Sequence, residues 1–262
     1  MRLITGFDHV VIAVRDIERG VSLYETLLDR TAQQALVRDD VATALIDTRN
    51  LAVELMAPVG PGASRLEAAL QDGGEGLKSL VFATDDIERL HGRCERIGLA
   101  PDAIIERDGA CSFRANTERT HGVRLFFMQR SQTREFSAAV GLDHIVIRTP
   151  NPERAGALYG ARLGLDMRLD REVAGRRLMF FRCGDAIVEI VHDPALTDDR
   201  DKLWGISWRV ANADAARARL AEAGLDVSEV RPGMKPGTRV FTVRDKTCGV
   251  PTLMIETTRK PD

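Results

Sequence analysis

The feature that most constrains the fold of this chain is an internal repeat at an offset of 135 residues. The segment GFDHVVIAV, which begins at Gly6, matches GLDHIVIRT, which begins at Gly141. The same offset aligns further identical residues without a gap, namely His9 with His144, Glu18 with Glu153, Tyr24 with Tyr159, Leu28 with Leu163 and Glu54 with Glu189. A match at one fixed period indicates that the chain arose by duplication.

Each copy has the pattern of a strand, a helix and three further strands. In the first copy, Phe7–Val14 alternates like a strand, and Asp16 is a helix N-cap for a helix that ends near Leu28. Two strands are expected between residues 31 and 47, and another at Asn50–Met56 before a Pro- and Gly-rich turn. The third copy repeats this βαβββ pattern from Gly141 to about Val191.

Two weaker copies follow the strong ones. The second has a strand at 77–84, a helix from Asp85 or Asp86 to Gly98 and a last strand at 123–129. The fourth has the corresponding elements at 203–210, 214–224 and 247–256. Their turn motifs match after a one-residue insertion, and the match aligns Gln129 with Glu256. The sequence therefore predicts an α+β fold of four βαβββ units in two tandem domains, residues 1–130 and 140–262, joined by a linker at 131–139.

Composition excludes several classes of protein. The 262 residues carry a net charge of −2 without a block of like charge, so neither nucleic acid nor a membrane surface is the expected partner. No apolar run approaches the roughly 20 residues of a membrane span. The four cysteines are scattered and read as reduced thiols of a cytoplasmic protein. A small molecule is the expected partner, and the sequence leaves open whether the domains pair within one chain or across a homodimer.

Alternation along the first strands separates two faces. One face is apolar, for example Ile145 and Ile147, and is expected to pack against the helices. The other face is polar in the C-terminal half, where it carries His144, Arg148, Gly205, Ser207 and Arg209. Because an unpaired buried polar group costs about 1–3 kcal/mol, such a face indicates a functional site.

The Asp-His-Val/Ile-Val-Ile strand, the helix after it and the closing Val-Glu-Leu/Ile strand resemble the vicinal oxygen chelate superfamily over essentially the whole chain. This superfamily includes glyoxalase I, extradiol dioxygenases, methylmalonyl-CoA epimerase, fosfomycin resistance enzymes and bleomycin-binding proteins. The resemblance implies cupped mixed sheets that hold a divalent metal ion. It constrains the fold far more than the reaction, because one scaffold serves many chemistries.

The resemblance implies two candidate metal sites. The first comprises His144, Glu189 and Glu256, with Gly205 at the fourth position, and the second comprises His9, Glu54 and Gln129, with Ser79 at the fourth position. Such donors suit Fe, Mn, Ni, Co or Zn, which would act as a Lewis acid or orient two substrate oxygens. The remaining predicted roles are a base at Glu189 or Glu256 and substrate binding by Arg148, Arg209 and Ser207.

Departures from the family pattern leave two functions open. Gly205 stands where extradiol dioxygenases need a second histidine, which disfavours ring cleavage. One reading is a metal-dependent enzyme, a lyase, isomerase or dioxygenase, acting on a small oxygenated and anionic compound. The other is a metal-free binding protein of the bleomycin-resistance type. The arginines could instead form salt bridges with Glu189 or Glu256, and Trp204 and Trp208 are expected to pack in the core or at a domain interface.

Overall fold

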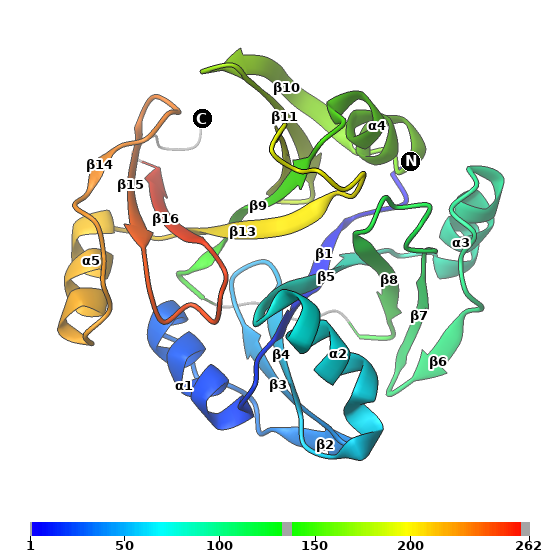
Figure 1. Ribbon diagram of the computed structural model, residues 1–262, viewed down its shortest axis with the longest axis horizontal. Coiled ribbons are helices and arrows are strands. Elements are labelled where there is room, and N and C mark those ends of the chain that lie inside the picture. The colour runs from blue at the N-terminus through cyan, green and yellow to red at the C-terminus, as the bar shows by residue number, and fades with distance from the viewer. Residues whose placement is uncertain (1, 133–137, 258–262) are drawn as a thin grey trace. The chain divides into compact units, whose positions relative to one another are not determined.

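The structure is a computed structural model that describes residues 2–132 and 138–257 (Figure 1). Most of the predicted linker at 131–139 therefore lies outside the described residues. In the part of the chain that is described, no helix has the length and apolar character that a membrane crossing requires. The structure shows the predicted α+β fold, in which all four βαβββ units are present.

The first two βαβββ units each contain the one helix that the repeat predicts, and an additional helix lies in the connection between them. The first unit consists of β1 (Gly6–Ala13), α1 (Ile17–Leu28), β2 (Leu36–Arg38), β3 (Val41–Asp47) and β4 (Ala52–Pro58). The connection contains η1 (Pro61–Ala63) and α2 (Ser64–Gly73). The second unit consists of β5 (Gly76–Ala83), α3 (Ile87–Arg96), β6 (Ile105–Arg107), β7 (Ala110–Arg114) and β8 (Arg124–Arg130).

The last two units repeat the pattern. The third consists of β9 (Gly141–Thr149), α4 (Pro152–Gly156), η2 (Ala157–Arg162), β10 (Asp166–Val173), β11 (Arg176–Cys183) and β12 (Ala186–His192). The fourth consists of β13 (Lys202–Arg209), α5 (Ala213–Glu222), β14 (Arg231–Pro232), β15 (Thr238–Val243) and β16 (Thr252–Thr257). The strands form two eight-stranded sheets, in the orders β2-β3-β4-β1-β5-β8-β7-β6 and β10-β11-β12-β9-β13-β16-β15-β14.

The four repeat helices begin in the same way. Each is preceded by an Asp or Asn whose side-chain oxygen accepts a hydrogen bond from the backbone N–H three residues later, the N-caps being Asp16, Asp86, Asn151 and Asn212. This bond satisfies one of the backbone donors that a helix N-terminus leaves free, and it stabilises the helix by about 1 kcal/mol. The predicted cap at Asp16 is thus confirmed, and Asp86 is the cap of the second repeat.

The helix of the third repeat differs from the single helix that the sequence predicts. It begins as α4 and continues as the π-helical turn η2. A Cβ atom at Gly160 would lie 3.1 Å from a ring carbon of Phe181, so glycine allows this turn to lie close against β11. Tyr159, in the same turn, is completely buried.

The chain divides into two compact units, and each unit draws on both halves of the sequence. The first contains residues 1–10, 78–135 and 144–204, and the second contains residues 11–77, 136–143 and 205–262. In the first compact unit, arginines link α3 and η2 in both directions. Arg93 of α3 donates to the carbonyl of Arg162, and Arg162 of η2 donates to the carbonyl of Ile97. The predicted domain limits, 1–130 and 140–262, stay a prediction.

In the second compact unit, an arginine of α5 links this helix to the end of α1. The guanidinium of Arg219 donates to the carbonyls of Thr26 and Leu27, which lie in the last turn of α1. Lysine and arginine side chains near a helix C-terminus satisfy free carbonyls and interact favourably with the helix dipole. Helix α5 covers strands β15 and β16 of the same unit (Figure 1).

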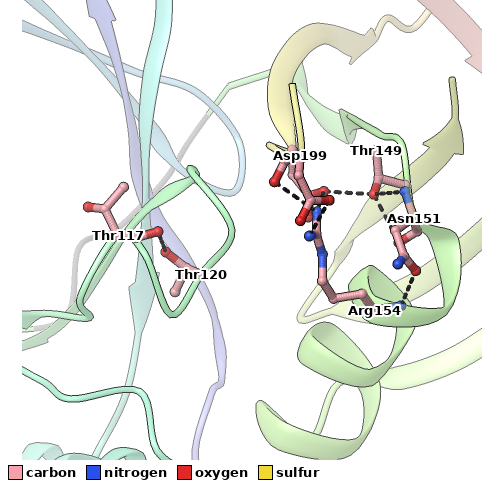
Figure 2. Close-up of polar contacts among 7 residues, drawn as sticks. Thr117, Thr120, Thr149, Asn151, Arg154 and Asp199 are labelled. Atoms are coloured by element: carbon pink, nitrogen blue, oxygen red, sulfur yellow. Dashed lines mark hydrogen bonds and ion pairs between the residues drawn. The ribbon is translucent and has the colours of Figure 1, made fainter. Parts of the chain in front are cut away.

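A polar cluster around the buried carboxylate of Asp201 joins the segment before β13 to the start of α4 in the first compact unit (Figure 2). The hydroxyl of Thr149 donates to Asp201 over 2.7 Å, and Arg154 donates to Asp201 over 3.2 Å and to Asp199 over 2.6 Å. Burial raises the pKa of the Asp201 carboxyl although these hydrogen bonds oppose the shift. The cluster holds a carboxylate in the protein interior without completing its hydrogen bonds, since Oδ2 of Asp201 has no partner among the described residues.

Candidate functional site

The third repeat brings two predicted site residues into contact. Strand β9 carries His144 and pairs in parallel with β12, which carries Glu189. Glu189 lies directly opposite Val146, so its side chain is on the same face of the sheet as His144. Nε2 of His144 lies 3.2 Å from Oε2 of Glu189, and both side chains are largely buried, with 18% and 14% of their surface exposed. The structure therefore brings these two predicted site residues together on one face of the sheet.

A second ion pair lies further along the same two strands. Arg148 on β9 lies opposite Val191 on β12, and Asp193 follows two residues later on the same side. The guanidinium of Arg148 pairs with the carboxylate of Asp193, which is 1% exposed. The predicted alternative for Arg148 was a salt bridge to Glu189 or Glu256, whereas in the structure Arg148 pairs with Asp193.

Trp204 contacts Arg148 and is not a core residue. The guanidinium carbon of Arg148 lies 5.7 Å from the centre of the Trp204 ring, within the range of a cation–π contact. The indole is 45% exposed because Trp204 lies near the beginning of β13, before the strand enters the core. The expectation of a packed residue is therefore wrong for Trp204, whereas Trp208 is completely buried as expected.

Glu256 and Gln129, the closing residues of the fourth and second repeats, both bind a helix N-terminus. Oε2 of Glu256 accepts a hydrogen bond of 2.8 Å from the amide of Ala213, the first residue of α5. Oε1 of Gln129 accepts one of 2.8 Å from the amide of Ile87, the first residue of α3. The bonds satisfy free backbone donors, and the charge of Glu256 favours the positive end of the helix dipole.

The register of β13 and β16 explains why Glu256 turns to the helix. Ser207 lies opposite Leu253, and Arg209 lies opposite Ile255. Side chains of directly opposed residues share a face, so Glu256 points to the other side of the sheet. Ser207 is buried, and Nε of half-buried Arg209 lies 3.5 Å from a carboxylate oxygen of Asp143.

His9, of the second predicted metal set, has a different environment from His144. Its Nδ1 lies 2.6 Å from Oδ1 of Asp8, and Arg130 donates to both carboxylate oxygens of Asp8 over 2.6 and 2.7 Å. Burial alone would raise the pKa of the Asp8 carboxyl, but the bonds from His9 and Arg130 hold that pKa well below its usual range. Glu54, the other predicted ligand, is half-buried on β4 opposite Leu45.

Sequence reasoning did not assign a role to Asp8, Arg130 or Asp193. Asp8 belongs to the repeated Asp-His motif, and Arg130 directly follows Gln129 at the end of β8. Asp193 directly follows β12, the strand of Glu189. Each is therefore adjacent to a residue that was already singled out, and this adjacency is the signal that could have identified it.

The described side chains do not fit a complete metal site. No group of three His, Cys, Asp or Glu residues with the arrangement of metal ligands occurs among residues 2–132 and 138–257. His144 and Glu189 supply two donors, whereas a catalytic site for such an ion ordinarily has three protein ligands. The third predicted donor, Glu256, binds the start of α5. The metal assignment stays a prediction.

Comparison with known proteins gives the family of this chain. A family model for the glyoxalase/bleomycin resistance protein/dioxygenase superfamily matches residues 8–117 and 143–242. The chain therefore belongs to this superfamily, the vicinal oxygen chelate superfamily, and the resemblance drawn from the sequence is confirmed. A search of curated protein sequences found no match.

Solved structures show the same fold at low sequence identity. A mutant of 4-hydroxymandelate synthase from Streptomyces coelicolor superposes with a TM-score of 0.81 at 11% identity, covering 99% of this chain and 94% of its own. A hypothetical protein from Staphylococcus aureus has a TM-score of 0.65 at 11% identity, covering 95% and 98%. Methylmalonyl-CoA epimerase from Mycobacterium tuberculosis covers 50% of this chain and 92% of its own, with a TM-score of 0.46 at 20% identity. The two longer matches support the two-domain fold.

Proposed function

We propose that this protein is an enzyme that acts on a small, oxygenated, anionic organic compound by proton transfer at the His144–Glu189 pair. The observation that carries the proposal is the 3.2 Å contact between these side chains on one face of the third repeat. Histidine is the side chain whose ordinary titration lies nearest neutral pH, and a carboxylate partner orients its ring. Such a pair is suited to general acid–base catalysis.

Arg148 supports an anionic substrate. It lies on the same face of β9 as His144, four residues along the strand. Its pairing with Asp193 holds the guanidinium in place while about a third of the side chain remains exposed. A guanidinium binds a carboxylate through two parallel hydrogen bonds, which fixes the orientation of the substrate. Arg209 and Ser207 remain predicted contacts of the same substrate.

A metal-free binding protein is the second candidate. On the polar face of the second and fourth repeats, the closing strands place Phe126 opposite Val81 and Leu253 opposite Ser207. Neither phenylalanine nor leucine can ligate a metal, and both favour apolar packing of a ligand. In this candidate function, the site binds a small molecule without catalysing a reaction.

Proton transfer can be detected before the physiological substrate is known. The panel consists of α-keto acids, α-hydroxy acids, catechols and hemithioacetals, and the readout is exchange of substrate C–H protons in D2O by NMR, with product formation measured in parallel. Each reaction is run with chelator and with added Mn, Fe, Co, Ni or Zn. We expect at least one compound to exchange or convert. His144→Ala and Glu189→Gln should reduce its kcat/KM by about 10²- to 10⁴-fold, the usual size of general acid–base catalysis.

The control is His91→Gln, which removes a histidine on α3 that contacts Phe113. It should leave the rate unchanged, and thermal unfolding should show that all variants are folded. Unchanged rates in His144→Ala would overturn the proposal. Binding of panel compounds without exchange or conversion would favour the binding protein instead, and the absence of any binding would reject this class of substrate.

A further inference from the structure

An aromatic ring and a cation meet at the end of the third repeat that is opposite the His144–Glu189 pair. Arg148 lies against the indole of Trp204 at 5.7 Å, and the indole is 45% exposed. Exposing a tryptophan is unfavourable, since it leaves a large apolar surface in water. The exposed parts of the indole and of the guanidinium are therefore available to a planar ligand that stacks on them.

Asp193 fixes the position of this arginine. Its carboxylate is 1% exposed, pairs with Arg148 and also accepts a hydrogen bond of 3.2 Å from the amide of Ala195. Its own amide donates to the carbonyl of Thr149 over 2.8 Å. A long arginine side chain ordinarily loses much of its rotamer freedom when it is immobilised on binding. The structure has already immobilised Arg148 through Asp193, so a ligand meets a preorganised guanidinium.

The separation of His144 and Arg148 limits which compounds can reach both. They are four residues apart on one strand, about 13 Å at ~3.3 Å per residue. Val146 lies between them on the same face of β9, Glu189 lies opposite Val146 on β12, and Val191 lies opposite Arg148. A compound that reaches both residues thus passes Val146 and the carboxylate of Glu189 and meets an apolar side chain beside Arg148.

We propose that Arg148 and Trp204 form an anchoring site for an aromatic carboxylate. In this site the carboxylate binds the guanidinium, and the aromatic ring stacks on the exposed indole. The inference rests on the proposed function for its consequence, which is that the substrate acted on at His144 is an aromatic acid. The anchoring itself involves no chemical step, so it can be tested without turnover.

The probe pair is benzoate and cyclohexanecarboxylate, which have the same charge and similar size but differ in aromaticity. Affinities are measured by calorimetry. Tryptophan fluorescence gives a second readout, because the chain has two tryptophans and Trp208 is completely buried. We expect benzoate to bind about five- to tenfold more tightly than cyclohexanecarboxylate, the size of an aromatic stacking contact. Benzoate should also change the emission of Trp204.

Two variants separate the two parts of the site. Trp204→Leu should weaken benzoate about five- to tenfold and abolish the preference over cyclohexanecarboxylate, while Trp204→Phe should retain part of the preference. Arg148→Gln should weaken both acids by tenfold or more. The control Arg244→Gln removes an exposed arginine that pairs with Asp226, and it should change neither affinity.

Equal affinities of the two acids, or benzoate binding that Trp204→Leu leaves unchanged, would overturn the inference. So would a wild-type protein that binds neither acid. His144→Ala distinguishes this result from a failure of the proposed function, because it should abolish proton transfer and keep benzoate binding. If the panel shows no proton transfer but benzoate binds through Trp204, the anchoring site stands and the enzymatic proposal falls.

Discussion

His9 and His144 occupy equivalent positions in the first and third repeats, but they have different carboxylate partners. His9 bonds through Nδ1 to Asp8, its own neighbour in the sequence, and it is 7% exposed. His144 contacts Glu189 through Nε2, across two parallel strands, and remains accessible. The Asp-His motif is thus the same in both repeats, while the use of the histidine is not.

The different environments of the two histidines follow from the arginine that pairs with the preceding aspartate, Asp8 or Asp143. Arg130 holds both oxygens of Asp8, and the resulting buried network fixes His9 from one side. A carboxylate oxygen of the equivalent Asp143 lies 3.5 Å from Nε of Arg209, and Asp143 is more exposed than Asp8. A repeated motif therefore predicts the position of a histidine but not its role, because the role depends on a residue from another repeat.

The largest expected effect separates the two aspartates. Asp8→Asn should lower the free energy of unfolding by about 2–4 kcal/mol, because it leaves Arg130 without its buried partner. Asp143→Asn, the matched change in the third repeat, should cost less than about 1 kcal/mol, since its ion pair is longer and more exposed. Urea unfolding followed by circular dichroism measures both values. Equal losses would show that the two motifs are used alike.

The pH dependence should have opposite signs for Asp8 and Asp201. The folded-state pKa of Asp8 is lowered, so its contribution is complete above its ordinary value of 3.8 and is lost as the pH falls toward the folded value. The folded-state pKa of Asp201 is raised by burial, so its contribution is complete below 3.8 and is lost as the pH rises through the folded value.

Unfolding of wild type, Asp8→Asn and Asp201→Asn from about pH 3 to about pH 7 tests these signs. The advantage of wild type over Asp8→Asn should grow as the pH rises toward the ordinary value of 3.8 and stay constant above it. The stability of wild type relative to Asp201→Asn should instead decline as the pH rises above 3.8. Parallel curves for the three proteins would contradict both assignments.

The smallest expected effect concerns the equivalent tyrosines of the two repeats. The buried hydroxyl of Tyr24 donates to the carbonyl of Thr247 over 3.4 Å, whereas the buried hydroxyl of Tyr159 has no hydrogen-bond partner in the described part of the chain. Tyr24→Phe should therefore cost about 0.5–1.5 kcal/mol. Tyr159→Phe should be neutral or stabilising, because it removes a buried unsatisfied group. A larger loss for Tyr159→Phe in thermal unfolding would reveal a missing partner.

Much of the fold follows from local patterns. The repeated strand–helix pattern places α1 within a residue of the predicted limits, because a capping side chain and an alternating strand act over only a few residues. The offset that aligns His9 with His144 identifies the first and third βαβββ units, and the matching turn motifs identify the second and fourth. It does not identify the one-turn change to η2, which depends on how closely Gly160 approaches Phe181.

The site was only partly predictable. Strand alternation places His144 and Arg148 on one face, the family resemblance groups His144 with Glu189, and the structure adds Asp193 as the partner of Arg148. The sequence does not predict that Glu256 binds the start of α5. A carboxylate at the end of a strand can point to either face of the sheet, and the register of β16 selects the face.

The sequence by itself therefore determined the family, the repeat and the set of polar residues. All of these can be recognised from short motifs, in which each residue constrains only its near neighbours along the chain. Only the tertiary structure decided which carboxylate each histidine contacts and where Arg148 and Trp204 meet. Those contacts join residues that are distant in sequence, and their energies depend on burial and on strand register.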